Sequence, residues 1–294
     1  MRFAPAIALA LAACAPQVDL VALGQKPDAG DLSKDAGVDT APLPDTAPPP
    51  PPPRCSPIAT STITLIDQNW TLYAFNPATT EVQLLGQPIC MQKQPSPVAV
   101  SVTVEPNGNI WLTVPGAETV IVDRATNGCT KPPMQLPVGA DSIAFGRLAG
   151  LPDNLGDDLY ALLGGAKLIH LTSDLQIVDN WGAPPELQQA PPPAVVATGD
   201  GRVFFVGVMP DMMIGIGGVY PSGKADPPSE LKEIAAKEFP PTAAAPWKAD
   251  FLLFGMSEVR AFHPSTSIVD PVLPLKTIAA IVGAGVSTCA WSGP

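Results

Sequence analysis

The sequence predicts an all-β protein, and three observations support this fold class. From residue 58 to residue 294, short runs rich in Val, Ile, Leu, Phe and Tyr alternate with turns built from Asn, Asp, Gly and Pro, as expected for strands joined by hairpins. One strand-and-turn unit recurs in this region at intervals of 43 to 49 residues. No long helical period is present, and the stretch 229–237 is the one candidate helix.

The recurring unit indicates a β-propeller. Its clearest copies are residues 72–79, 120–126 and 259–266, with weaker copies at 168–174 and 218–223. Pro, Asn and Asp stand at turn positions that they favour. The register marks Asn76, Asp123, Thr172, Tyr220 and His263 are separated by 47, 49, 48 and 43 residues. A period of this length is typical of four-stranded propeller blades.

The first and last parts of this region together make up one further repeat. Joining the stretch after His263 to the stretch before Asn76 gives an interval of 49 residues, so we expect five blades in a closed ring. Residues 281–289 would form the innermost strand of the blade whose other strands begin near Thr62. Closure of this kind protects sheet edges. A six-bladed ring and a β-sandwich are the alternatives.

The N-terminus is similar to the export signal of bacterial lipoproteins. Arg2, an apolar run over 3–11 and the lipobox Leu-Ala-Ala-Cys at 11–14 carry the resemblance. It implies that residues 1–13 form a signal peptide and that Cys14 carries the lipid, whose three acyl chains exceed the two needed for stable anchoring. Ala15 stands where an Asp would hold the protein at the inner membrane. We therefore expect anchoring to the outer membrane of a Gram-negative bacterium, facing either the periplasm or the outside.

Residues 14–57 combine the lipidated Cys14 with a predicted disordered tether. The segment is rich in Pro, Asp and Ala, repeats Asp-Ala-Gly at 28–30 and 35–37, and ends in consecutive prolines at 48–53. It offers no periodic apolar face to bury, and its proline run favours a stiff polyproline II rod. A proline-rich recognition motif is the alternative.

Residues 58–294 are expected to form one propeller domain, monomeric and attached to the membrane through the lipid alone. This body contains 21 Asp and Glu against 12 Lys and Arg, a net charge of −9. Its acidity argues against binding to nucleic acid or to anionic lipid headgroups. No run after Cys14 has the apolar length of a membrane-spanning helix.

The cysteines are typical of an oxidising compartment. With Cys14 assigned to lipid, Cys55, Cys90, Cys129 and Cys289 remain, and four cysteines allow three pairings. The closed ring would bring Cys55 near Cys289, so we predict a disulfide there. Cys90 and Cys129 then pair between the outer parts of adjacent blades. No pair has the spacing of a zinc site.

Candidate catalytic residues are few. His170 and His263 are the only histidines, and neither lies in a metalloprotease or haem motif. Ser257 and Ser287 lack the nucleophile-elbow pattern. We therefore predict no catalytic, metal-binding or cofactor-binding residue and no cofactor.

A denser acidic group lies at Asp153, Asn154, Asp157 and Asp158. We interpret these residues as solvated positions of a long loop. A bound calcium ion is the alternative, although the alternating acidic ladder of a calcium loop is absent.

Binding is the function class that the predicted fold favours, because a propeller gathers loops at one face around a channel. Loops joining the blades would present Trp181, Trp247 and Lys248, and Asp141 would lie at the mouth of an inner strand. A methionine-rich loop would add an adaptable surface. The candidate binding face is therefore Asp141, Trp181, Met209, Met212, Met213, Trp247 and Lys248.

Two functional hypotheses follow. The first is a lipid-anchored envelope protein whose propeller is a binding or scaffold module for a protein or glycan. The alternative is a metal-dependent propeller hydrolase or lactonase, which requires carboxylates and amides from several blades to converge on the channel. The inner-strand segments 98–102, 143–146 and 282–287 are mainly small or apolar, which favours the first hypothesis.

A second resemblance concerns the body. Ile-Val-Gly-Ala-Gly-Val-Ser-Thr-Cys at 281–289, together with segments 72–79 and 198–204, resembles a group of propeller-like lipoproteins from myxobacteria and their relatives. The chain departs from that group at Asn76, where Asp is common, and at Ala290, where Pro is usual. The resemblance implies the fold and the location, and it carries no activity.

Overall fold

The computed structural model describes most of the body. The described residues are 55–97, 99–114, 118–132, 136, 140–146, 157–164, 167–172, 176–182, 194–199, 202–208, 213–219, 232–235, 241–271, 273–275 and 278–290. The signal peptide, the lipidated Cys14 and the tether up to residue 54 lie outside them, so these assignments stay predictions.

Five sheets form the body, each with a four-stranded path from an inner to an outer strand. Blade 1 comprises β21 (Ile281–Gly285), β1 (Ile63–Asp67), β2 (Leu72–Asn76) and β3 (Glu81–Gly86). Blade 2 comprises β4 (Ser101–Val104), β5 (Ile110–Thr113), β6 (Val120–Val122) and β7 (Cys129–Thr130). Blade 3 comprises β8 (Ala140–Gly146), β9 (Asp158–Leu163), β10 (Lys167–Leu171) and β11 (Ile177–Gly182).

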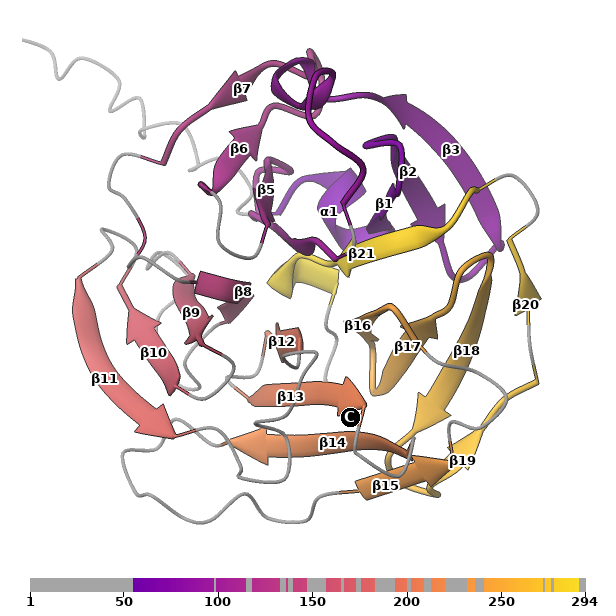
Figure 1. Ribbon diagram of the computed structural model, residues 1–294. Helices are drawn as coiled ribbons and strands as arrows, with labels where there is room; N and C mark the ends of the chain where they lie inside the picture. Colours follow the sequence, from indigo (N-terminus) through magenta and orange to yellow (C-terminus); the bar gives the residue numbers. More distant parts are fainter. Residues whose placement is uncertain are drawn as a thin grey trace, which may run out of the picture. The chain divides into compact units, whose positions relative to one another are not determined.

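The remaining blades complete the ring in Figure 1. Blade 4 comprises β12 (Ala194–Ala197), β13 (Val203–Val208), β14 (Met213–Val219) and β15 (Lys232–Ala235). Blade 5 comprises β16 (Ala243–Trp247), β17 (Asp250–Phe254), β18 (Glu258–His263) and β19 (Ile268–Val269), and β20 (Leu273–Pro274) also pairs with β18. The inner strands contact one another in a closed cycle, β21, β4, β8, β12 and β16. The predicted five-bladed propeller is confirmed.

The ring closes as predicted, with the last strand completing the first blade. β21 pairs with β1 in antiparallel register, Thr64 opposite Gly285 and Ile66 opposite Gly283. Figure 1 shows yellow β21 lying beside indigo β1. The register marks of the repeat fall at the end of the third strand of each blade or directly after it, which explains why their spacing revealed the blades.

The inner strands lie side by side around the channel and are parallel to one another, so all of them begin at the same end of it. The hydroxyl of Ser101 near the start of β4 accepts a hydrogen bond from the Ile143 amide at 2.8 Å, and Thr242 before β16 donates to the carbonyl of Ile281 at 2.6 Å. Val104 and Ser287 form a parallel bridge at the other end. We call the end where the inner strands begin the leading end, and the end where they finish the trailing end.

Hydroxyl side chains join neighbouring blades at the inner strands. The Ser142 hydroxyl of β8 accepts from the Val195 amide of β12 at 2.9 Å. Thr103 of β4 accepts from the Phe145 amide of β8 at 3.0 Å. These bonds satisfy backbone groups that face another sheet, where a pairing strand is missing.

The core consists of separate apolar clusters, one at each blade interface. One cluster joins Ile63 and Phe75 of blade 1 to Phe254 of blade 5, and the other clusters lie between blades 1 and 2, 2 and 3, 3 and 4, and 4 and 5. Phe75 and Phe254 meet edge to face with ring centroids 6.0 Å apart, a favoured aromatic geometry. Each blade therefore buries both faces.

Two disulfides join segments that are separated in the sequence, and both are the predicted pairs. Cys55 is bonded to Cys289, with Cα atoms 5.8 Å apart. Cys90 is bonded to Cys129, with Cα atoms 5.9 Å apart, and links the segment after β3 to β7. The disulfides are consistent with an exported protein.

The described helices are short. α1 (Pro57–Ser61) begins at Ser56, whose hydroxyl accepts from the Ala59 amide at 3.2 Å; η1 (Ile89–Met91) and η3 (Thr288–Ala290) are 3₁₀ turns. No helix within the described part of the chain has both the length and the hydropathy to cross a membrane.

The candidate helix at 229–237 is wrong, because residues 232–235 form the outer strand β15. Ile234 of β15 pairs with Ile214 of β14. A short amphipathic pattern gives a helix little stability by itself. The open edge of β14 offers a ladder of backbone hydrogen bonds instead, and tertiary context overrides local propensity.

Candidate functional site

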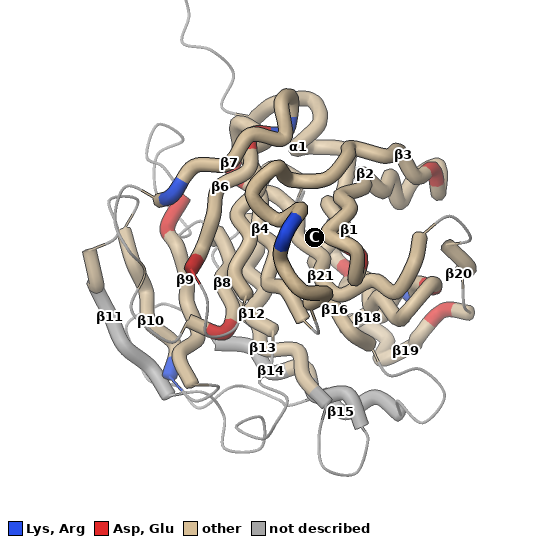
Figure 2. The backbone as a smooth tube through the Cα atoms, turned by 45° about the horizontal axis from the view of Figure 1, so that its top comes forward, with Lys and Arg blue, Asp and Glu red and all other residues tan. Residues whose placement is uncertain are grey.

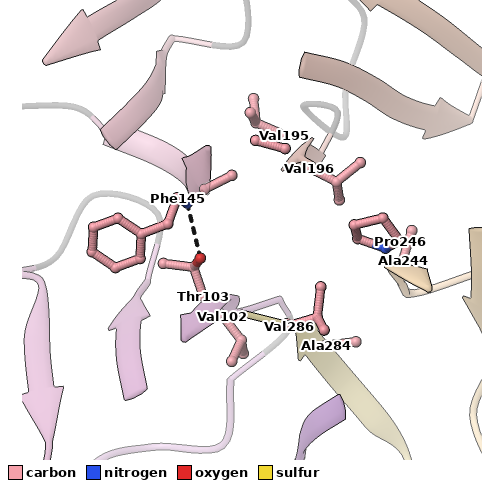
Figure 3. Close-up of a pocket in the computed structure, with 12 residues that line it drawn as sticks. Val102, Thr103, Phe145, Val195, Val196, Ala244, Pro246, Ala284 and Val286 are labelled. Atoms are coloured by element: carbon pink, nitrogen blue, oxygen red, sulfur yellow. Dashed lines mark hydrogen bonds between the residues drawn. The ribbon is translucent and has the colours of Figure 1, made fainter. Parts of the chain in front are cut away.

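A narrow channel runs between the five inner strands. Figure 3 shows the side chains around it, contributed by every blade. The lining residues are Val102, Thr103, Ala144, Phe145, Val195, Val196, Ala197, Ala244, Pro246, Ala284, Gly285 and Val286. The cavity volume is about 10 Å³, which is about the room for one water molecule.

The channel lining is almost entirely apolar. Thr103 carries the one polar side chain among the lining residues, and its hydroxyl already accepts from the Phe145 amide, the dashed line in Figure 3. Elsewhere in the described residues, no group of three or more His, Cys, Asp or Glu is placed to hold a metal ion. The convergent carboxylates that a metal-dependent hydrolase needs are not supplied by the described lining.

The chain that follows β21 crosses the trailing end of the ring from blade 1 to blade 3. Thr288 in η3 donates a hydrogen bond to the carboxylate of Asp157, which precedes β9 in blade 3. Cys289 is bonded to Cys55, and α1 contacts η3. Chain segments from blades 1 and 3 are therefore joined across this end of the ring.

Asp157 and Asp158 differ from the solvated loop residues expected at these positions. Asp157 is 6% exposed and accepts the Thr288 hydrogen bond. Asp158 begins β9, and its carboxylate lies 3.0 Å from Nε2 of His170. No local pattern signals the contact of Asp157 with Thr288, because the two residues are 131 positions apart. Asp153 and Asn154 lie outside the described residues.

The leading end carries part of the candidate binding face. Asp141 is half-buried at the start of β8, where the register with β9 shifts between Ala140 and Ser142, and such bulges redirect a side chain. In register terms, Trp181 near the end of β11 and Met213 at the start of β14 also belong to this end. Met209 and Met212 lie outside the described residues.

Trp247 and Lys248 lie at the trailing end, away from Asp141. Trp247 is the last residue of β16 and not part of a loop between blades; it is 9% exposed and packs in the cluster between blades 1 and 5. Lys248 is exposed in the hairpin that leads to β17, with φ of 53°. The structure thus divides the candidate face between two ends, and a binding role for its members stays a prediction.

The two histidines are held by carboxylates. Nδ1 of His263 lies 2.8 Å from Asp250 and Nε2 lies 3.1 Å from Asp270. The hydrogen bond to Asp250, reinforced by the one to Asp270, raises the pKa of His263 above its ordinary value. His170 is buried and stacks on Tyr160, with ring centroids 4.8 Å apart.

Charged side chains are spread over the described body, and some of them form pairs, as Lys131 does with Glu118 at 2.6 Å. Figure 2 shows Lys and Arg at isolated positions along the described backbone. One contact could not be predicted from the sequence. Arg124, after β6, contacts Thr62 beside α1, and the two residues are 62 positions apart in the chain. No local motif signals such a contact.

Fold and channel define the class of protein: a five-bladed β-propeller with a ring closed by its own C-terminal strand and a narrow apolar channel. No family model and no curated protein matches the sequence. Solved structures that resemble this chain do so at low sequence identity.

One of them, a nidogen/laminin complex, has 7% identity, a TM-score of 0.46 and coverage of 76% of this chain and 97% of that chain. A protein of unknown function from Bacteroides caccae has 9% identity, a TM-score of 0.41 and coverage of 73% of each chain. BBS1N in complex with ARL6DN has 15% identity, a TM-score of 0.40 and coverage of 75% of this chain and 64% of that chain.

Proposed function

We propose that this protein is a lipid-anchored envelope protein whose propeller binds a protein or glycan partner. The observation that carries the proposal is the channel, which is apolar and has a volume of about 10 Å³. A cavity of this size holds no substrate, since ligand pockets usually have volumes of some 300 Å³ or more. Binding therefore takes place on the outer surface of the ring.

The leading end is the surface that we assign to the partner. At the trailing end, the Cys55–Cys289 disulfide and the contact of η3 with α1 bring two chain segments together. At the leading end, Gln68 is exposed in the β1–β2 turn, and Met256 is 65% exposed in the β17–β18 turn. Exposed methionine gives an adaptable contact surface.

Site-specific photo-crosslinking in cells tests the binding surface. A photoreactive residue in place of Gln68 or Met256 should trap the same partner, whereas the matched position Lys248 at the trailing end should trap none. Adducts formed only from Lys248 would reverse the assignment of the surface. The absence of any reproducible adduct, together with a stoichiometric metal in the purified protein, would favour the hydrolase alternative.

The lipid anchor is tested separately at Cys14. The Cys14→Ser variant should lose labelling by radioactive palmitate and should move from the detergent phase to the aqueous phase on phase partitioning. The body keeps its own disulfides in this variant, because Cys14 is not part of either pair. Unchanged labelling and partitioning would show that Cys14 is not the anchor.

A further inference from the structure

Arg124 has an unusual environment on the outer surface of blade 2. It lies in the turn between β6 and β7, and its closest polar contact is the hydroxyl oxygen of Thr62, 3.5 Å from Nη1 and 3.4 Å from Nη2. Its Nε atom is buried and has no hydrogen-bond partner. Among the described residues, no carboxylate forms an ion pair with it. Within that part of the chain, the polar contact of the guanidinium is therefore with one neutral oxygen.

Two polar groups next to Arg124, the Asp123 carboxylate and the Thr62 hydroxyl, form hydrogen bonds with other parts of the chain. The carboxylate of Asp123 accepts hydrogen bonds from the amides of Ala125 and Thr126 at 2.9 Å each and from the Thr126 hydroxyl at 3.1 Å. These bonds hold the pKa of Asp123 below its ordinary value, so it stays ionised. The Thr62 hydroxyl donates to the carbonyl of Ile58 at 2.9 Å and offers Arg124 only its lone pairs.

An unpaired guanidinium in this position is costly. Partial burial of Arg124 lowers its pKa by desolvation, because removing a charge from water without a partner disfavours the charged form. A buried donor without an acceptor calls for an explanation, and a bound ion is one that the chemistry of a guanidinium allows. Each Nη of Arg124 carries two hydrogens, and the hydrogens that do not point at Thr62 can donate charge-assisted bonds to an oxyanion.

We propose that Arg124, held in place by its contact with Thr62, binds a carboxylate group. A singly charged carboxylate fits better than a phosphate, because the ionised Asp123 is the next residue and the body as a whole is acidic. The carboxylate belongs to an acidic side chain of a peptide or to a free organic acid. This site lies beside α1, apart from the leading end, so it goes beyond the partner surface proposed above and does not depend on it.

Thermal unfolding of the full-length protein tests the site. The Tm is measured in sodium acetate, in N-acetylaspartate amide and in sodium phosphate, each against sodium chloride at equal ionic strength. A ligand that binds only the native state raises the Tm with its concentration. We expect a rise with both carboxylates and a smaller one with phosphate. A larger rise with the aspartate derivative identifies a peptide carboxylate, and equal rises identify a free acid.

Two variants complete the experiment. Arg124→Gln should lose the carboxylate response, with an apparent affinity weakened about tenfold or more by the loss of charge-assisted bonds, and in chloride it should unfold at the same Tm as the wild type or higher. Lys131→Gln removes the same charge from a surface pair with Glu118 and should keep the full response. An Arg124→Gln variant that melts lower in chloride while the wild type ignores acetate would show a purely structural arginine. A phosphate response above that of acetate would overturn the carboxylate assignment.

Discussion

At the residue scale, His263 shows how one side chain secures the outer part of a blade. Its two ring nitrogens reach Asp250 of β17 and Asp270 after β19, so one imidazolium joins segments on both sides of its own strand. Only the doubly protonated ring can donate to both carboxylates. The contact is partly exposed, with side-chain exposures of 30% for His263 and 34% for Asp250, so its contribution to stability is modest.

The raised pKa of His263 predicts how stability depends on pH. The contribution is fully present below the unfolded-state value of about 6.5 and is lost as pH rises through the higher folded-state value. We expect the His263→Gln variant to be less stable than the wild type by about 0.5–1 kcal/mol at pH 5.5, with a smaller difference at pH 9. Urea unfolding at a series of pH values measures this. A difference that grows with pH would contradict the assignment.

At the element scale, the composition of β21 follows from how closely it approaches blade 2. A Cβ atom on Gly283 would lie 2.4 Å from the carbonyl oxygen of Val100, and one on Gly285 would lie 2.1 Å from that of Val102. The Val100 amide donates to the Val282 carbonyl at 2.9 Å. The strand that closes the ring therefore meets its neighbour backbone against backbone, and glycine is required where they touch.

Substitution of Gly285 by Ala tests this close approach. The added methyl group would collide with backbone atoms of β4 that cannot move independently, so we expect a loss of about 2–3 kcal/mol or more in the free energy of unfolding. Gly128→Ala is the control, because its new Cβ would meet only the hydroxyl of Thr126 at 3.1 Å. Denaturant unfolding of both variants measures the difference. Equal stabilities would mean that the seam tolerates wider spacing.

At the scale of the whole molecule, stability is divided among the blade interfaces, and the closing seam carries a covalent link. The Cys55–Cys289 disulfide spans 234 residues and the Cys90–Cys129 disulfide spans 39. A crosslink that closes a longer loop removes more entropy from the unfolded chain. The two bonds therefore differ in what they contribute, although both join neighbouring parts of the fold.

Double serine variants compare the two disulfides without leaving a free thiol. Removing the Cys55–Cys289 bond should cost about 1.5 kcal/mol more than removing the Cys90–Cys129 bond, by the loop-length dependence of chain entropy. Chemical unfolding of the two double variants under identical conditions checks this order. The reverse order would indicate that native-state contacts around Cys90 and Cys129 outweigh the difference in loop length.

The five-bladed ring could be predicted from the sequence, whereas the contacts on its surface could not. The difference lies in how far apart in the sequence the interacting residues are. Turn residues such as Asn76 and Asp123 recur in register because each blade repeats the same local geometry, so spacing alone revealed the fold. The end at which Trp247 lies depends on strand direction within blade 5. The contacts of Arg124 with Thr62 and of Asp157 with Thr288 join residues 62 and 131 positions apart, which no local pattern encodes.

The bond between Cys55 and Cys289 also has a mechanical consequence. Any tension that reaches the body through the chain before Cys55 passes first to this disulfide, and through it to both β1 and β21. These two strands already pair with each other, so the force loads two neighbouring strands together instead of peeling one from the sheet. A body held by one end of its chain is thereby protected from unravelling at the point where it is pulled.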